Sequence, residues 1–216
     1  MPYASNQGVQ IHYEVEGNGP SLVLLHGLGA NLEAFREYGY VEALKEKYRL
    51  ILIDVRGHGA SDKPHDPEAY QTKLLVADVV AVLDQLRVEK AHFFGYSMGG
   101  AIGFGIAKYA PSRCCSMIIG GNHPYKPNAD EQAELDSIIQ LYRKGNDALV
   151  ADVEKQLGPK MTPAIRTRLL ASDSEAIVAM LSSELSTCSF EEVLPTMKMP
   201  CLLYAGENDE TYSGAR

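Results

Sequence analysis

The sequence predicts an α/β fold, a doubly wound and mostly parallel sheet whose two faces are covered by helices. Two observations support this prediction. Short, continuously apolar runs alternate along the first part of the chain with longer segments in which apolar residues recur at helical spacing. Continuously apolar strands are typical of parallel sheets buried on both faces. The chain has 216 residues, which is enough for one domain with a sizeable core.

The predicted strands are apolar runs that are too short for helices and are bounded by glycine, proline or polar residues. In chain order they cover residues 9–17, 21–27, 49–54, 91–97, 115–121 and 200–206.

The predicted helices lie between these strands. Residues 32–47 place apolar side chains at helical intervals, and the same spacing recurs over 70–86. A third helix follows the strand at 91–97 and is expected to end at Pro111, because a proline within a helix lacks the N–H and clashes with the preceding turn.

Residues 122–195 break the alternation, since they hold several helical patterns, around 129–144, 146–156 and 172–185, and no convincing strand. We interpret them as a helical cap inserted into a core formed by residues 1–121 and 196–216. The alternative is that these helices cover the surface of the core itself. We interpret the apolar residues of this region as contacts between helices; they include Ile139, Tyr142, Leu149, Ile177 and Leu181.

Composition excludes several classes of function. The net charge of −8 argues against binding to nucleic acid or to an anionic membrane surface, both of which require basic patches. The apolar runs are too short to span a membrane, and the first ten residues lack the features of a signal peptide. We therefore expect a cytoplasmic protein that binds a small-molecule substrate, and the composition leaves its oligomeric state open.

No cofactor or metal is predicted, since the motifs HExxH and GxxxxGK and a complete GxGxxG are all missing from the sequence. The cysteines have no CxxC spacing. We expect buried free thiols at all four positions, which are Cys114, Cys115, Cys188 and Cys201.

The strongest functional signal is the motif GYSMG at residues 95–99. It lies where a predicted strand turns into a helix, which is the context that defines a nucleophile elbow. Such a sharp turn exposes the serine, Ser97, above the edge of the sheet. Glycine is expected at positions 95 and 99 because side chains there would collide with neighbouring backbone. The helix that follows would favour negative charge at its N-terminus.

Four motifs occur in an order and at a spacing that resemble the α/β-hydrolase family. They are HGLGA at 26–30, DVRGHGASDKP at 54–64, GYSMGG at 95–100 and PCLLYAGENDE at 200–210. The resemblance extends from about residue 9 to the end of the sequence. It implies an α/β-hydrolase fold with an inserted cap.

The resemblance also implies roles for individual residues. Ser97 would be the nucleophile, and the backbone N–H groups of Leu28 and Met98 would form the oxyanion hole. Asp209 would be the acid of the catalytic triad. Backbone donors suit an oxyanion hole because they are fixed in place before charge develops.

Other residues near these motifs have a structural and a functional interpretation. Tyr96 is a candidate for substrate binding, as is Met98, although both are also compatible with core packing. His123, just after the strand at 115–121, is a further substrate-binding candidate. We interpret His26 as a residue that shapes its loop. Three residues of the glycine-rich turn are expected to hold that turn in place: Arg56, His58 and Asp62.

The triad base is missing from the expected position. The family order implies a histidine beyond Asp209, after a further helix and strand. Only ETYSGAR follows Asp209, which is shorter than the roughly 10 residues or more that a crossover helix and its connections need. Three explanations stay open: the chain is a fragment lacking its last helix and strand, His123 substitutes as the base, or the protein is a non-catalytic relative.

Two functions follow from this reading. The first is a serine hydrolase that acts on a small ester, lactone or related carbonyl compound through an acyl-enzyme. Without the histidine, this 216-residue form is expected to be inactive. The alternative is a non-catalytic relative that binds a small ligand. A serine at position 97 argues against chemistry that uses a carboxylate nucleophile.

Overall fold

The computed structural model describes residues 2–207 and contains a mixed, mostly parallel sheet of seven strands in this part of the chain. The strand order is β1-β2-β4-β3-β5-β6-β7, and all pairs from β4 to β7 are parallel. The strands are β1 Tyr3–Asn6, β2 Val9–Glu16, β3 Ser21–Leu25, β4 Arg49–Ile53, β5 Ala91–Tyr96, β6 Cys114–Gly120 and β7 Cys201–Tyr204. This confirms the predicted fold class.

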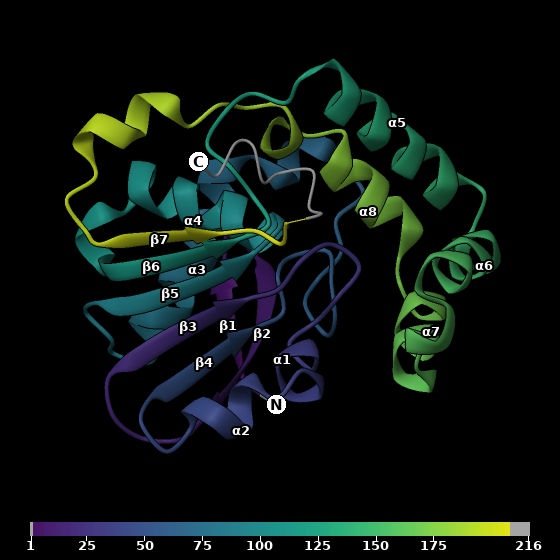
Figure 1. Ribbon diagram of the computed structural model, residues 1–216. Coiled ribbons are helices and arrows are strands. Elements are labelled where there is room, and N and C mark those ends of the chain that lie inside the picture. Colours follow the sequence, from purple (N-terminus) through teal and green to yellow (C-terminus); the bar gives the residue numbers. More distant parts are fainter. Residues whose placement is uncertain (1, 208–216) are drawn as a thin grey trace.

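Helices cover both faces of this sheet (Figure 1). Helices α3 (Thr72–Gln85) and α4 (Met98–Tyr109) pack on one face, where the main apolar cluster lies. Helices α1 (Ala34–Glu37) and α2 (Tyr40–Leu44) pack on the other face in a smaller cluster. The strands β3, β4 and β5 are apolar on both sides because they contribute to both clusters.

Four further helices lie beyond the ends of the parallel strands, on the right in Figure 1. They are α5 Ala129–Arg143, α6 Asn146–Leu157, α7 Pro163–Leu170 and α8 Ser174–Leu181. Their facing sides form a third apolar cluster, which confirms the predicted packing of Ile139, Tyr142, Leu149, Ile177 and Leu181. We propose that these helices are the cap predicted over residues 122–195.

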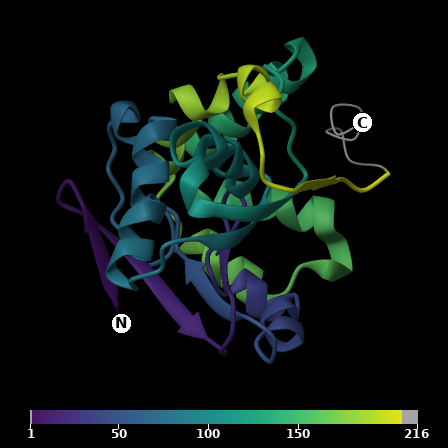
Figure 2. The same cartoon turned by 90° about the vertical axis from the view of Figure 1, so that its left-hand side faces the viewer.

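Short 3₁₀ helices join several of these elements. Their bounds are η1 Pro67–Tyr70, η2 Pro111–Arg113, η3 Gly158–Lys160, η4 Glu184–Ser186 and η5 Glu191–Thr196. Just before η5, Phe190 stacks on Phe104 of α4, so the chain returns to the main core before it enters β7 (Figure 2). The described residues include no helix that has both the length and the apolar character needed to cross a membrane.

Three local predictions were wrong or incomplete. Residues 32–47 form two short helices instead of one, because Gly39 takes a left-handed φ of 79° between them. Strand β1 was not predicted, since only Tyr3 and Ala4 give it apolar character. Helix α7 was also missed, because few apolar residues mark its buried side and only Leu169 is buried.

The cysteines correct a further expectation. All four are free thiols, as predicted, but Cys115 and Cys201 are exposed. Cys114 is buried, whereas its neighbour Cys115 is exposed at the point where the pairing register between β5 and β6 shifts. Cys201 lies on β7, which pairs with β6 alone among the described residues. Position at the start of a strand therefore did not ensure burial.

Candidate active site

Ser97 lies in a strained turn between β5 and α4. Its φ of 51° and ψ of −115° are rare for a residue with a side chain, and such conformations cost about 1–3 kcal/mol. The surrounding backbone holds this turn in place. The Ser97 N–H donates to the Gly120 carbonyl at 2.7 Å, and the Ser97 carbonyl accepts from Gly100 at 2.8 Å and Ala101 at 3.1 Å. The Asn122 side-chain amide donates to the same carbonyl at 3.1 Å.

The two glycines of the motif are required by close backbone contacts. A Cβ at Gly95 would lie 2.2 Å from the Gly99 carbonyl oxygen, and a Cβ at Gly99 would lie 2.1 Å from the Leu25 oxygen. Helix α4 therefore begins directly against β3 and β5. On the opposite side, a Cβ at Gly27 would lie 3.4 Å from the Cβ of Ser97. The loop after β3 thus packs closely on the turn that carries Ser97.

Two buried histidines hold the loop that contains Leu28. His26 donates from Nδ1 to the Gly27 carbonyl at 2.8 Å and accepts at Nε2 from the Val55 N–H at 3.1 Å. His58 accepts at Nε2 from the Gly29 N–H at 3.2 Å. Burial lowers the pKa of His26, and burial together with the nearby His26 lowers the pKa of His58 to about 3. Both rings are therefore neutral acceptors that fix the loop.

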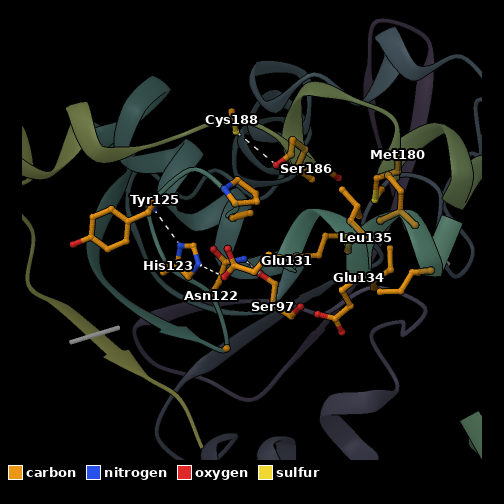
Figure 3. Close-up of a pocket in the computed structure, with 18 of the residues that line it drawn as sticks. Ser97, Asn122, His123, Tyr125, Glu131, Glu134, Leu135, Met180, Ser186 and Cys188 are labelled. Carbon is orange, nitrogen blue, oxygen red and sulfur yellow. Dashed lines mark hydrogen bonds and ion pairs between the residues drawn. The ribbon is translucent and has the colours of Figure 1, made fainter. Parts of the chain in front are cut away.

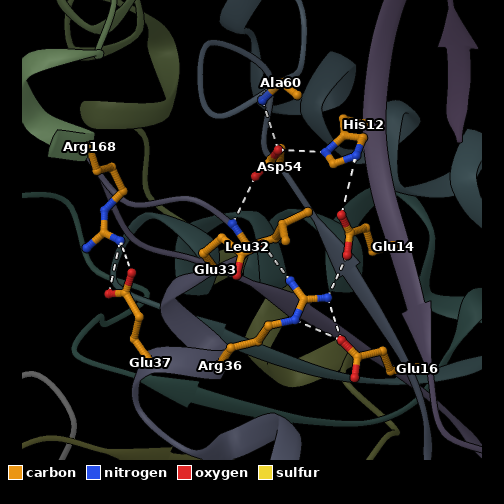
Figure 4. A network of polar contacts seen from close by, with 10 residues as sticks. All are labelled: His12, Glu14, Glu16, Leu32, Glu33, Arg36, Glu37, Asp54, Ala60 and Arg168. Carbon is orange, nitrogen blue, oxygen red and sulfur yellow. Dashed lines mark hydrogen bonds and ion pairs between the residues drawn. The ribbon is translucent and has the colours of Figure 1, made fainter. Parts of the chain in front are cut away.

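Asp54, just after β4, connects three segments around this loop (Figure 4). Its carboxylate accepts from the Leu32 N–H at 2.8 Å, from the Ala60 N–H at 2.9 Å and from His12 Nδ1 at 2.8 Å. Arg36 of α1 joins the carboxylates of Glu14 and Glu16 on β2 and that of Glu33, the residue just before α1. The loop is thereby tied to the N-terminal hairpin.

The glycine-rich turn after β4 is held by a second set of contacts. Arg56 and Asp78 are each 3% exposed and form a buried ion pair, with Nη2 and Oδ1 separated by 2.6 Å. The Asp62 carboxylate accepts from the Gln10 N–H at 2.7 Å. These contacts, with those of His58, agree with the predicted structural role of this turn. The polar side chains of this turn therefore support the surrounding loops and do not line the cavity.

Ser97 lines a cavity of about 460 Å³ between the sheet edge and helices α5 and α8 (Figure 3). Of the predicted site residues, the cavity brings together Leu28, Tyr96, Ser97, Met98 and His123. Within residues 2–207, the backbone N–H groups of Leu28 and Met98 have no protein acceptor. Asp209 lies outside the described residues.

His123 lines the cavity without contacting Ser97. Its Nδ1 accepts from the Tyr125 N–H at 3.2 Å, and its Nε2 donates to Glu131 Oε1 at 2.8 Å. Both ring nitrogens therefore have partners within the loop and the start of α5. Each of the other five histidines also has a partner other than Ser97: His12 with Asp54, His26 with Val55, His58 with Gly29, His65 with Asp173 and His92 with Ser116.

Asn122 and Glu131 are among the cavity residues that the sequence reasoning missed. Asn122, which braces Ser97, directly follows the strand at 115–121, so its place at the active edge of the sheet was a usable signal. Glu131 has a weaker signal: the spacing of Asn128 and Glu131 is that of a capping box, which forms at the start of α5. Nothing in that motif indicates that Glu131 also faces a cavity.

Comparison with known proteins agrees with this architecture. A sequence profile described as "alpha/beta hydrolase fold" matches residues 20–174, which include the elbow and the loops around it. The chain belongs to the α/β-hydrolase family.

Members of the α/β-hydrolase family resemble the chain over nearly all of its length. The AB hydrolase superfamily protein YisY of Bacillus subtilis is 28% identical over 95% of this chain and 80% of its own length. The 3-oxoadipate enol-lactonase 2 of Acinetobacter baylyi is 30% identical over 94% of this chain and 77% of its own length.

Two solved structures also resemble the chain over nearly all of its length. A hydrolase from Pseudomonas aeruginosa has a TM-score of 0.85 at 25% identity and covers 99% of this chain and 83% of its own. The enol-lactonase from Burkholderia xenovorans has a TM-score of 0.82 at 25% identity and covers 100% of this chain and 85% of its own.

Proposed function

We propose that the protein is a serine hydrolase of small esters or lactones, with Ser97 as the nucleophile. The observation that supports this proposal most directly is the strained φ of Ser97 at the wall of a cavity. Strained backbone persists where the surrounding structure enforces it, and it is concentrated at functional sites. The family membership and the two similar enol-lactonases agree with acyl-transfer chemistry.

In the proposed reaction, the Ser97 Oγ attacks the substrate carbonyl carbon and its proton passes to a general base. The carbonyl oxygen gains negative charge, and we propose that the N–H groups of Leu28 and Met98 stabilise it. The carbonyl re-forms as the alkoxide leaving group departs and takes up a proton. Water then hydrolyses the acyl-enzyme in the same sequence of steps, which releases the acid and restores Ser97.

The fixed backbone explains why these two N–H groups suit the role. Leu28 lies between two residues whose backbone groups bind buried histidines, with the Gly27 carbonyl on His26 and the Gly29 N–H on His58. Met98 is the first residue of α4, where N–H groups lack partners within the helix. Neither donor needs to reorganise as charge develops.

The alternative, a non-catalytic protein that binds a small ligand, has one observation in its favour. Within residues 2–207, each of the six histidines of the sequence is bonded to a residue other than Ser97, and no hydrogen bond joins a histidine to Ser97. The expected inactivity of this 216-residue form stays a prediction, and one assay tests both functions.

That assay combines a fluorophosphonate with a para-nitrophenyl ester of a short acid. If the protein is the proposed hydrolase, the intact mass gains a single fluorophosphonate adduct, mapped to Ser97 by peptide analysis, and the ester is turned over by the unmodified protein but not by the variant Ser97→Ala. Turnover without loss in Ser97→Ala would place the chemistry elsewhere. No adduct and no turnover, with ligand binding retained, would support the binding protein.

A further inference from the structure

Helix α5 presents two carboxylates to the cavity. Residues three, four and seven positions apart share one face of a helix, and the face of α5 that lines the cavity carries Glu131, Glu134, Leu135 and Ile138. Figure 3 shows both glutamates among the residues gathered near Ser97. Two acidic side chains therefore lie in the space that receives the substrate.

Glu131 is held in its ionised form. Partial burial acts to raise its pKa, but hydrogen bonds from His123 and from the Asn128 N–H outweigh burial and lower the pKa. The two carboxylate oxygens are separately engaged, with Oε1 at 2.8 Å from His123 Nε2 and Oε2 at 2.7 Å from the Asn128 nitrogen. Hydrogen bonds to the charged form of a carboxyl group favour that form.

The neighbouring histidine bonds this carboxylate through one of its two ring nitrogens. His123 Nδ1 accepts from the Tyr125 N–H at 3.2 Å, and a ring nitrogen that accepts carries no proton. The proton of the hydrogen bond to Glu131 sits on Nε2. The carboxylate of Glu131 therefore lies at the wall of the cavity with His123 as its side-chain partner.

The rest of the described lining offers no compensating cation. Its carboxylates are those of Glu131 and Glu134, and neither lysine nor arginine occurs among the described residues that line the cavity. Much of the remaining wall is apolar: it includes Leu135, Ile138, Met180, Leu181, Leu185 and Phe190. An apolar wall lowers the local dielectric, so a second negative charge placed here would be poorly solvated and repelled.

We propose that this cavity selects substrates whose acyl group is neutral or cationic and disfavours those that carry a carboxylate. This inference rests on the proposed function, since it treats the cavity at Ser97 as the acyl site. The selectivity would separate this chain from its relative in Acinetobacter baylyi, which is named for 3-oxoadipate, itself a carboxylate.

The test measures binding with three para-nitroanilides, because amides resist hydrolysis far better than esters. After the same three methylene groups, their acyl chains end in a tert-butyl, a trimethylammonium or a carboxylate group. The first two are nearly identical in shape, so charge is the main difference between them. Dissociation constants of all three are measured by titration calorimetry at pH 7 and low ionic strength, where charge interactions are least screened.

We expect the carboxylate ligand to bind at least about tenfold more weakly than the tert-butyl ligand, and the trimethylammonium ligand at least as tightly as the tert-butyl one. The variant Glu131→Gln keeps a capping-box residue at that position and removes the charge. We expect it to reduce the penalty on the carboxylate ligand to about threefold or less, measured against the tert-butyl ligand in the same variant.

Asp136→Asn is the matched control. Asp136 lies on the same helix but is exposed and does not line the cavity, so the same change of charge there is expected to leave all three affinities unchanged. Equal or tighter binding of the carboxylate ligand would overturn the inference. The inference would also be overturned by an undiminished penalty on the carboxylate ligand in Glu131→Gln or by an equal loss of that penalty in Asp136→Asn. It would be overturned as well if all three ligands failed to bind.

The matching para-nitrophenyl esters separate this inference from the proposed function. Hydrolysis in the same order of preference supports both. Ordered binding of the anilides without hydrolysis of any ester would refute the proposed enzyme and leave the charge selectivity standing. Hydrolysis that favours the carboxylate ester would refute the selectivity and leave the serine hydrolase standing.

Discussion

The contact between Gly99 and β3 allows a sharp test of how the nucleophile turn is built. In the variant Gly99→Ala, the new Cβ would lie 2.1 Å from the Leu25 oxygen and 2.6 Å from its carbonyl carbon. Both are backbone atoms of a central strand that pairs on each side, with β4 and β5. The strand cannot yield, so the start of α4 has to move away.

The expected cost follows from two opposing effects. Overpacking a dense core typically costs about 1–3 kcal/mol, and a backbone clash belongs at the upper end of that range. Replacing glycine with alanine in a helix returns at most about 1 kcal/mol. The net loss is therefore about 2 kcal/mol, which lowers Tm by roughly 4–8 °C in a chain of this size.

Gly103 provides the matched control within the same helix. A Cβ there meets only Ile119, at 3.5 Å, which is an ordinary van der Waals distance. Gly103→Ala is therefore expected to gain up to about 1 kcal/mol from helix propensity alone. Urea and thermal unfolding of both variants and the unmodified protein measure the difference. A Gly99→Ala protein as stable as the unmodified one, or a Gly103→Ala protein less stable than Gly99→Ala, would refute this reasoning.

Two further predictions concern strain and pH. Ser97→Gly should be about 1 kcal/mol more stable than Ser97→Ala, because glycine adopts the positive φ without strain, although it also increases the entropy of the unfolded chain. Equal unfolding midpoints of the two variants in urea would contradict this. His58 has a folded pKa of about 3 against 6.5 unfolded, so the unfolded state binds the proton first and stability falls as pH drops below 6.5. Between pH 6.5 and 5 this loss of stability is roughly 2 kcal/mol. Urea titrations should show a smaller loss in the variant His58→Gln, whose side-chain amide oxygen still accepts from the Gly29 N–H. Equal losses in the variant and the unmodified protein would show that His58 is not the group responsible.

The elements that could be predicted from the sequence are those encoded by local signals. Apolar runs marked the central strands, and the motif at 95–99 located Ser97 because its glycines are dictated by contacts with the immediate surroundings. The break at Gly39 was not predicted, although glycine is present there, since helical spacing continues across it. Apolar periodicity reports which face is buried and not where the backbone turns.

The parts of the site that could not be predicted depend on contacts between distant segments. His12 and Asp54 are separated by 42 positions in the chain, and no local pattern relates them. The capping box at Asn128 announces a helix start, but the side of α5 on which Glu131 meets His123 is set by how that helix packs. Candidate residues could be named one by one, whereas their partners required the fold.

The carboxylate of Asp54 has a consequence for how mutations combine. It is shared by His12 on β2, the backbone at Leu32 and the backbone at Ala60, so three segments have one common acceptor. Residues joined through one partner show non-additive effects of up to about 3 kcal/mol. A substitution at His12 should therefore change the energetic cost of a substitution in the loop beside Ser97. Substitutions in the hairpin of β1 and β2 are thereby constrained by the loop beside Ser97, which lies outside that hairpin.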